Sequence, residues 1–297
     1  MASIRQISQR RKAIDSIARM TRTLGMISST RYKAYSSQWA LTGAYRDALA
    51  RVAYLLATPV KPLDHPLLKE NTSGRTALLV IGSRQGLCGA YNAEIYQLVE
   101  VHLQQAQAQG RQLDLYVPHG KLESVLAARG VTPAKVYTDL DERPTDPQIH
   151  AMADDFIDQY MAGKLDSFGI VYKRFYSASS QQAQTLTILP LLELVDDLTT
   201  RSLVIWPWDL TFEDFYMTPS PDRIVEELAR MLAHHSILSC FIDAILSEHL
   251  ARMVAMKSAT DNAEDMIRQL STDYNRARQT QITSELLDIV TGMGALE

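Results

Sequence analysis

The chain has 297 residues, of which 46% are hydrophobic and 22% are charged, a composition typical of a folded protein with one large or two ordinary domains. It contains no apolar run near the roughly 20 residues that cross a bilayer, and its basic start lacks the apolar core of a secretion signal, so we expect a soluble protein that is not exported. Cys88 and Cys240 lie far apart and form no CxxC pair, which excludes a zinc knuckle or a disulfide framework and predicts two buried free thiols.

The net charge of −4 hides an uneven distribution. Residues 1–57 contain ten Lys/Arg and two Asp/Glu, a balance of +8, whereas residues 58–247 contain 15 and 24, a balance of −9. A basic segment on an acidic body predicts an electrostatic partner for that segment, either nucleic acid or an acidic protein surface. Because the basic residues are not interleaved with aromatic ones, nucleic acid is the weaker interpretation.

Residues 2–57 contain no proline, and we expect one long helix there that Pro59 and Pro62 end. Intervals of three and seven place an apolar stripe along this helix, and Arg10, Arg11 and Thr21 interrupt it. The residues of the stripe are Ile4, Ile7, Ile14, Ile17, Leu24 and Ile27.

The middle of the chain, 76–215, alternates between short apolar runs and helical patterns. Strands are expected at 76–82, 112–117, 168–175 and 184–189, and the last two form a hairpin around the polar turn 177–182. Helices are expected at 92–109, 119–129 and 147–163, the first two being closed by Gly110 and Gly130. This alternation predicts a Rossmann-like α/β domain.

After Pro221 neither proline nor glycine occurs before Gly292, which predicts a second long helix. Steps of three and four from Ile224 to Gln281, with one extra step of four, trace a heptad seam in which 13 of 17 positions are apolar or alanine. The seam positions are Ile224, Leu228, Met231, His235, Leu238, Ile242, Ile245, His249, Met253, Met256, Thr260, Ala263, Ile267, Leu270, Tyr274, Ala277 and Gln281. Such a seam needs a partner helix, so we expect the two chain ends to form an antiparallel coiled coil.

The glycine-rich stretch "SRQGLCGAYN" (83–92) follows an apolar strand and precedes a helix, which is the layout of a phosphate-binding loop. It lacks the lysine of a Walker A loop, and Gly82 and Gly86 are four apart, so the GxGxxG fingerprint fails as well. We therefore interpret it as a tight turn whose glycines supply positive φ, with Arg84 free to contact a neighbour.

No catalytic constellation is evident in the sequence. There is no GxSxG elbow and no HExxH, and His235 and His249 stand 14 positions apart, too far to share one metal ion. We expect the histidines His234, His235 and His249 to be packed or to face a partner, and Trp206 and Trp208 to lie at a domain edge. No cofactor, metal or small-molecule substrate is expected, and the absence favours a mechanical or scaffolding role.

Three stretches resemble the γ subunit of F-type ATP synthases. These are "SEHLARMVAMKSATDNAEDMI" (247–267) with "YNRARQTQITSELLDIVTGMGAL" (274–296), the loop "SRQGLCGAYN", and the opening "MASIRQISQRRKAIDSIARMTRTLGMIS" (1–28). The resemblance covers the whole chain and is most specific at the C-terminal end.

The resemblance implies a non-catalytic rotor shaft. In that family the coiled coil sits inside a head of α and β subunits, and the globular domain rests with the ε subunit on a ring of membrane subunits. Ion flow turns ring and shaft together, and the asymmetric shaft drives the catalytic β sites through different affinities. The nucleotides then belong to the neighbours, and the complex sits on the cytoplasmic side of a bacterial plasma membrane.

Matching motif positions implies contacts with the head. Arg252, Arg278, Gln279 and Thr283 correspond to contacts with β-subunit catch loops, and the basic residues Arg19 and Arg22 suit an acidic lever loop of β. Arg84 lies on the loop near the rim of the head. The C-terminal tip from Ile289 to Leu296, with Met293, would enter an apolar sleeve at the top of the head.

The chain also departs from the family pattern. Arg84-Gln85 stands where an Asp-Arg pair is usual, and residues 19–28 read RMTRTLGMIS where KITxAMxMVA is usual. Gly25 inside a helix costs about 1 kcal/mol relative to alanine. These departures point to a divergent lineage or to a second ATPase copy in its host. The cysteine-bearing insertion of chloroplast members is absent.

The sequence thus predicts an α/β protein in three segments: a coiled-coil helix at 1–58, a central domain at 59–217 and a second coiled-coil helix at 218–297. The alternatives are a free-standing coiled-coil scaffold that binds another partner and an enzyme that uses the central domain.

Overall fold

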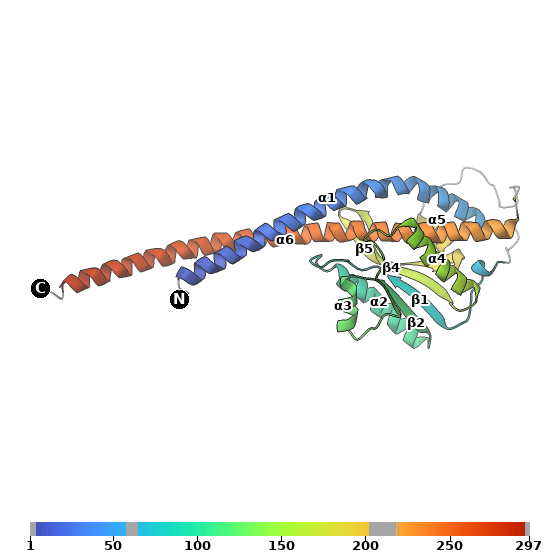
Figure 1. Cartoon of the computed structure of the whole chain (residues 1–297), viewed down its shortest axis with the longest axis horizontal. Coiled ribbons are helices and arrows are strands. Elements are labelled where there is room, and N and C mark those ends of the chain that lie inside the picture. The colour runs from blue at the N-terminus through green and yellow to red at the C-terminus, as the bar shows by residue number, and fades with distance from the viewer. Residues whose placement is uncertain (1–3, 58–64, 202–217, 219, 295–297) are drawn as a thin grey trace. The chain divides into compact units, whose positions relative to one another are not determined.

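The computed structural model describes residues 4–57, 65–201, 218 and 220–294. The described residues form two compact units: one combines residues 4–30 with 252–294, and the other consists of the described residues between 31 and 251. Figure 1 labels their helices and strands. Each unit contains part of both long helices, α1 (Ile4–Ala57) and α6 (Pro221–Gly294). The two predicted long helices are therefore confirmed, and α1 ends at Ala57, shortly before the first of the two prolines.

In the first unit, α1 and α6 pair in antiparallel fashion, as the sequence predicts. Arg11 lies over the ring of Tyr274 at 5.4 Å, whereas ten residues further along α1 the hydroxyl of Thr21 lies 2.7 Å from that of Thr260. Residue numbers thus rise along one helix as they fall along the other. The Thr21–Thr260 hydrogen bond is buried and fixes the register of the pair.

The predicted apolar stripe on α1 is confirmed at Ile4, Ile7, Ile14 and Leu24, which are half-buried. It is wrong at Ile17 and Ile27, which are 52% and 49% exposed, while Ala18, Thr21 and Ser28 are buried. Thr21 and the half-buried Arg11, which we expected to interrupt the stripe, belong to it. Side-chain size explains the correction: small residues let the helix backbones come close, and the two exposed isoleucines remain at the flanks.

The seam on α6 is confirmed in this unit from Met253 to Ala277, where its positions are buried or half-buried and most of their neighbours are exposed; the last predicted position, Gln281, is exposed. Before residue 252 the pattern changes, because residues 240–250 are buried on every side. Met231, a predicted seam position, is 44% exposed, whereas Val225 and Leu232 are fully buried. The prediction fails at Met231 because this half of α6 packs against a sheet, so the buried side of the helix is not the side that a single partner helix would cover.

The second unit contains a five-stranded sheet in the order β3-β2-β1-β4-β5. Its strands are β1 (Arg75–Val80), β2 (Gln112–Pro118), β3 (Lys135–Tyr137), β4 (Ser167–Ser177) and β5 (Ser180–Leu189). Pairing is parallel except between β4 and β5, which form the predicted hairpin. The short edge strand β3 was not predicted, since three residues give no periodic signal.

Helices cover both faces of this sheet. α2 (Tyr91–Ala108) and α3 (Lys121–Ala128) pack on one face with Leu78 and Val80 of β1, and α4 (Asp146–Met161), α5 (Leu191–Arg201) and α6 pack on the other with Leu79. Alternate side chains of one strand thus enter two apolar cores. A short 3-10 helix, η1 (Pro66–Leu68), joins the second core. The predicted α/β domain is confirmed, whereas α5 was not foreseen.

Gly25 faces the partner helix without crowding it. A methyl group added there would lie 3.5 Å from Cβ of Met256, which is ordinary contact. We expect Gly25→Ala to raise the free energy of unfolding by up to about 1 kcal/mol, because alanine restores helix propensity without a clash. Denaturant unfolding checks this. Gly25→Leu is the matched control and should be destabilising, and a destabilised alanine variant would contradict the expectation.

Two stacked histidines lie where α4 meets α6. The rings of His150 and His234 stack at 3.6 Å between centroids, and burial, followed by the nearby His150, lowers the pKa of His234 from 6.5. The unfolded chain therefore binds a proton more readily, so stability should fall as the pH drops below about 6.5.

His234→Phe keeps a ring in this place and removes the titration. We expect its melting temperature to fall less between pH 7.5 and pH 5.5 than that of the wild type, and calorimetry would measure the difference. His119→Phe, which changes an exposed histidine, serves as the control. Equal acid sensitivity of the His234 variant and the wild type would show that the stacked pair is not responsible.

Candidate functional site

The glycine-rich loop lies where open α/β sheets bind ligands. It follows β1 and leads into α2. The strands β2 and β3 lie on one side of β1, and β4 and β5 lie on the other, so the direction of strand addition reverses at β1. In doubly wound folds, ligands bind beyond the carboxyl ends of the strands at such a switch point. Its position in the sheet therefore makes this loop a candidate nucleotide-binding site.

A carboxylate of the chain itself occupies the backbone donors of this loop. Glu248 of α6 accepts the N–H of Arg84 at 3.0 Å through Oε2 and the N–H of Gln85 at 3.3 Å through Oε1. Its side chain is buried, with the residue 7% exposed. Two successive N–H groups around one anion form the arrangement that binds phosphate elsewhere. These donors are already engaged, so a phosphate could use them only by displacing Glu248.

Further hydrogen bonds hold the start of the loop. The N–H of Ser83 donates to Oδ1 of Asn92 at 2.9 Å, and Nδ2 of Asn92 donates back to the Ser83 hydroxyl at 2.7 Å. The N–H of Lys121 donates to the Ser83 carbonyl at 2.8 Å. Ser83 is thereby fixed to the first turn of α2 and to the start of α3, which gives Glu248 a rigid partner.

The glycines of the loop serve different purposes from those predicted. Only Gly89 has a positive φ, of 62°, and Leu87 adopts 65° although it is not glycine. Gly82 is required for space, because a Cβ there would lie 2.4 Å from Cβ of Leu122. Gly86 has open space around it. The expectation that the glycines as a group supply positive φ is therefore wrong for Gly82 and Gly86.

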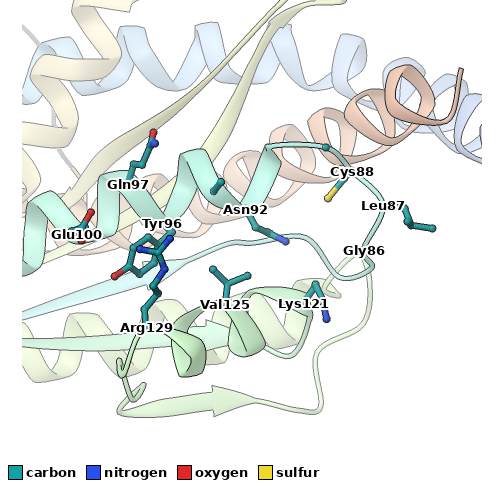
Figure 2. A pocket seen from close by; sticks show the side chains of 12 residues that line it. Gly86, Leu87, Cys88, Asn92, Tyr96, Gln97, Glu100, Lys121, Val125 and Arg129 are labelled. Atoms are coloured by element: carbon teal, nitrogen blue, oxygen red, sulfur yellow. The ribbon is translucent and has the colours of Figure 1, made fainter. Parts of the chain in front are cut away.

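A cavity of about 470 Å³ opens beside the loop, between α2 and α3. Figure 2 shows its lining, in which Arg129 lies beside Tyr96, at 5.0 Å from guanidinium carbon to ring centre. Among the described residues, the lining combines Lys121 and Arg129 with one carboxylate, Glu100, and its thiol, Cys88, is buried. None of these described lining residues is a histidine, so they offer no paired nucleophile and imidazole base.

The structure also shows the surroundings of the cysteines and of two of the histidines. Both cysteines are buried and free, as predicted. His235 packs against Tyr45 at 4.6 Å and His249 stacks on Tyr35 at 5.7 Å, so these histidines are packed, as expected. Within the described part of the chain, no group of three potential metal ligands occurs. Trp206 and Trp208 lie outside the described residues.

Most of the predicted head-contact residues lie at the surface of the first unit. Arg19 pairs with Asp15 at 2.9 Å, and Arg22 forms an ion pair with Glu264 across the two helices. Both arginines remain largely exposed. Arg22 therefore also helps to hold the helix pair together.

On α6, Arg278, Gln279 and Thr283 are exposed, and the Thr283 hydroxyl donates to the Gln279 carbonyl at 2.9 Å. Arg252 differs from them because it is only 4% exposed. The side chain of Met293 and the whole of Leu296 lie outside the described residues.

Arg84 is partly engaged within the chain, since its Nη1 donates to the Leu140 carbonyl at 2.9 Å. Sequence reasoning missed Glu248, the residue that anchors this region. Glu248 stands beside the seam position His249 and outside the predicted seam, so the heptad pattern did not predict its burial.

None of the helices in the described residues is both long enough and apolar enough to span a membrane.

Comparison with known proteins gives a consistent result over the whole length. Residues 3–296 match the family model described as ATP synthase. The ATP synthase gamma chain of Rhodopirellula baltica is 34% identical over 298 residues, and that of Synechococcus sp. (strain JA-3-3Ab) is 31% identical over 314; in both cases the whole of each chain is covered.

Solved structures show the same fold at lower identity. A chain of the Euglena gracilis mitochondrial ATP synthase matches with a TM-score of 0.65 and 18% identity, covering 99% of this chain and 94% of its own. A chain of the Tetrahymena thermophila central stalk and c-ring matches with a TM-score of 0.55 and 19% identity, covering 81% and 99%.

Glu248→Gln tests the carboxylate clamp on the loop. The amide keeps one acceptor oxygen, but its NH₂ group would face a backbone donor, so we expect a loss of about 1–3 kcal/mol in the free energy of unfolding. Glu227→Gln, an exposed change on the same helix, should cost little. Denaturant titration of both variants measures the difference, and equal effects would argue against the clamp.

Proposed function

Because this chain belongs to the ATP synthase gamma-chain family, we propose that it is the central shaft of a rotary ATP synthase and couples ion flow to conformational change in catalytic neighbours. Its partners are then the α and β subunits of the head, the ε subunit and the ring of membrane subunits. The chain itself is non-catalytic, and nucleotides bind to the head.

The antiparallel pair formed by the two chain ends is the observation that carries the proposal. A shaft needs a stiff element that enters its partner, and two helices packed along a continuous seam supply one. The buried Thr21–Thr260 hydrogen bond and the Arg22–Glu264 ion pair both cross the pair. A relative slide of the helices would break both contacts.

The surface of this unit supports an enclosed position. Several large apolar side chains are exposed along both helices, namely Ile17, Met20, Met26, Ile27, Val254, Met266, Ile282, Leu286 and Leu287. Exposed apolar side chains at this density are typical of a surface that a partner covers. Basic residues lie between them on α1, which suits an acidic partner surface.

The location follows from the same proposal. The chain would be held at the cytoplasmic face of a bacterial plasma membrane through the ring of its complex. A free-standing scaffold is the alternative, but a scaffold would not be expected to match ATP synthase gamma chains over their entire length. An enzyme built on the α/β domain is disfavoured because Glu248 occupies the donors at the switch point.

Reconstitution with the α and β subunits of the host tests the function. A shaft should co-purify with them and raise their ATPase rate. Failure to assemble, or assembly without any effect on the rate, would favour the scaffold.

Arg278→Ala combined with Gln279→Ala tests the proposed β contact. Both side chains are exposed, so the variant should keep the helix content and melting temperature of the isolated subunit. Against a β carboxylate, the lost charge-assisted hydrogen bonds are worth about 1.5–3 kcal/mol. We therefore expect slower turnover or weaker assembly.

Circular dichroism melts and ATPase rates of the reconstituted complex measure these effects. Arg111→Ala, an exposed arginine of the α/β domain, is the control. A much earlier melt would assign Arg278 and Gln279 to helix packing, and unchanged turnover with unchanged assembly would remove them from the contact.

A further inference from the structure

Residues 31–39 of α1 are held to the α/β domain by directed side-chain contacts. Of the α1 side chains that the structure describes, none is part of the two apolar cores of the α/β domain. α6, in contrast, contributes residues such as Val225, Leu232 and Phe241 to one of them. The attachment of α1 residues 31–39 therefore depends on individual polar and aromatic contacts.

Glu142, in the loop between β3 and α4, joins three parts of this unit. Its carboxylate forms an ion pair with Arg31 of α1 and lies 3.2 Å from Nε2 of His249 on α6. The His249 ring is buried and stacks on Tyr35, one turn along α1 from Arg31. Burial, followed by the Glu142 carboxylate, raises the pKa of Tyr35. Glu142, Arg31, His249 and Tyr35 are called the Glu142 interlock below.

The loop that carries Glu142 is itself fixed at several points. Nη1 of Arg84 donates to the Leu140 carbonyl at 2.9 Å, and Nη1 of Arg143 donates to Oε1 of Gln38 on α1 at 3.0 Å. Nε2 of Gln148 donates to the Asp139 carbonyl at 2.7 Å. Arg84 belongs to the glycine loop that Glu248 holds, so the two loops and α6 form one connected network.

A second group of contacts holds the next turn of α1. Nε1 of Trp39 donates to Oδ1 of Asp243 on α6 at 2.7 Å. The Trp39 ring meets Phe175 of β4 edge-on at 5.3 Å, and Tyr32 meets the same ring at 6.2 Å. α1 is thus bound to α6 and to the hairpin as well as to the 139–143 loop.

We propose that the Glu142 interlock is the element that transmits torque between α1 and the α/β domain. This inference rests on the proposed shaft function. Apolar contact by itself is non-directional, whereas a hydrogen bond weakens steeply when its geometry changes. The Arg31–Glu142 ion pair, the Arg143–Gln38 hydrogen bond and the stacking of Tyr35 on His249 therefore together resist rotation of α1 on the domain.

The interlock also explains why a polar loop is placed against two helices. The Glu142 carboxylate contacts Arg31 of α1 and His249 of α6, so the loop cannot move with one helix without altering its contact with the other. Loss of its charge would weaken the attachment of the loop to both helices, while the Arg143–Gln38 hydrogen bond and both apolar cores remain.

Glu142→Gln tests the proposal, with Asp141→Asn as a matched control one residue away, since Asp141 is exposed in the same loop. Hydrogen exchange of the assembled complex reports on the attachment. We expect the peptides covering residues 31–39 and 138–146 to exchange at least about fivefold faster in Glu142→Gln than in the wild type. Asp141→Asn should match the wild type.

Ion pumping per ATP hydrolysed, in complexes reconstituted into vesicles, reports on torque. Glu142→Gln should assemble and hydrolyse ATP but pump fewer ions per ATP, and Arg31→Gln should do the same. The double variant should lose no more than the more impaired single variant, because both changes break the same contact.

The outcomes separate the two proposals. If the wild-type chain assembles but neither stimulates ATPase nor supports pumping, the shaft function fails. If the wild type does both while Glu142→Gln and Asp141→Asn exchange and pump alike, the interlock is overturned. Faster hydrogen exchange with an unchanged number of ions pumped per ATP would show that Glu142 has a structural role only. That result would overturn the proposal that the interlock transmits torque.

Discussion

The burial of the first half of α6 against the sheet is the contact on which the α/β unit depends. Residues 240–250 are enclosed on every side, and this stretch supplies Glu248 to the glycine loop, His249 to the Glu142 interlock and Asp243 to Trp39. The same helix then continues into the pair with α1. One continuous helix therefore packs into a core, contacts two polar loops and pairs with a second helix. Its pattern of apolar and polar residues changes from one of these regions to the next.

That change explains which predictions from sequence succeeded. A heptad pattern predicts burial on one side of a helix, and it is correct from Met256 to Ala277, where α6 has one partner. It fails at Met231, where the sheet covers a different side. On α1 the isoleucine pattern is correct at Ile7 and Ile14 and wrong at Ile17 and Ile27, because close packing there selects small residues such as Ala18 and Thr21. Hydrophobicity alone does not show whether two helices pack closely through small residues or further apart through large ones.

The candidate site was only partly accessible to sequence analysis. The strand, glycine-rich turn and helix could be predicted, and the missing lysine argued against a nucleotide. The physical reason for a closed site, Glu248, lies more than 160 residues further along the chain, and no local motif links the two. The Glu142 interlock was missed for the same reason, since Arg31, Glu142 and His249 come together only through the fold. Exposed residues such as Arg278 and Gln279 could be assigned only by resemblance, because an exposed side chain leaves no trace of its partner in its own chain.

The small residues of the α1–α6 seam have a steric consequence. Contact at Thr21 and beside Gly25 brings the two helices close together, so the pair has a smaller cross-section than a leucine-lined pair would have. A partner that encloses the pair can therefore surround it with a narrower opening, and side chains of both helices come within reach of the same wall. Threonine and glycine at these positions thus set the width of that opening as well as a packing distance.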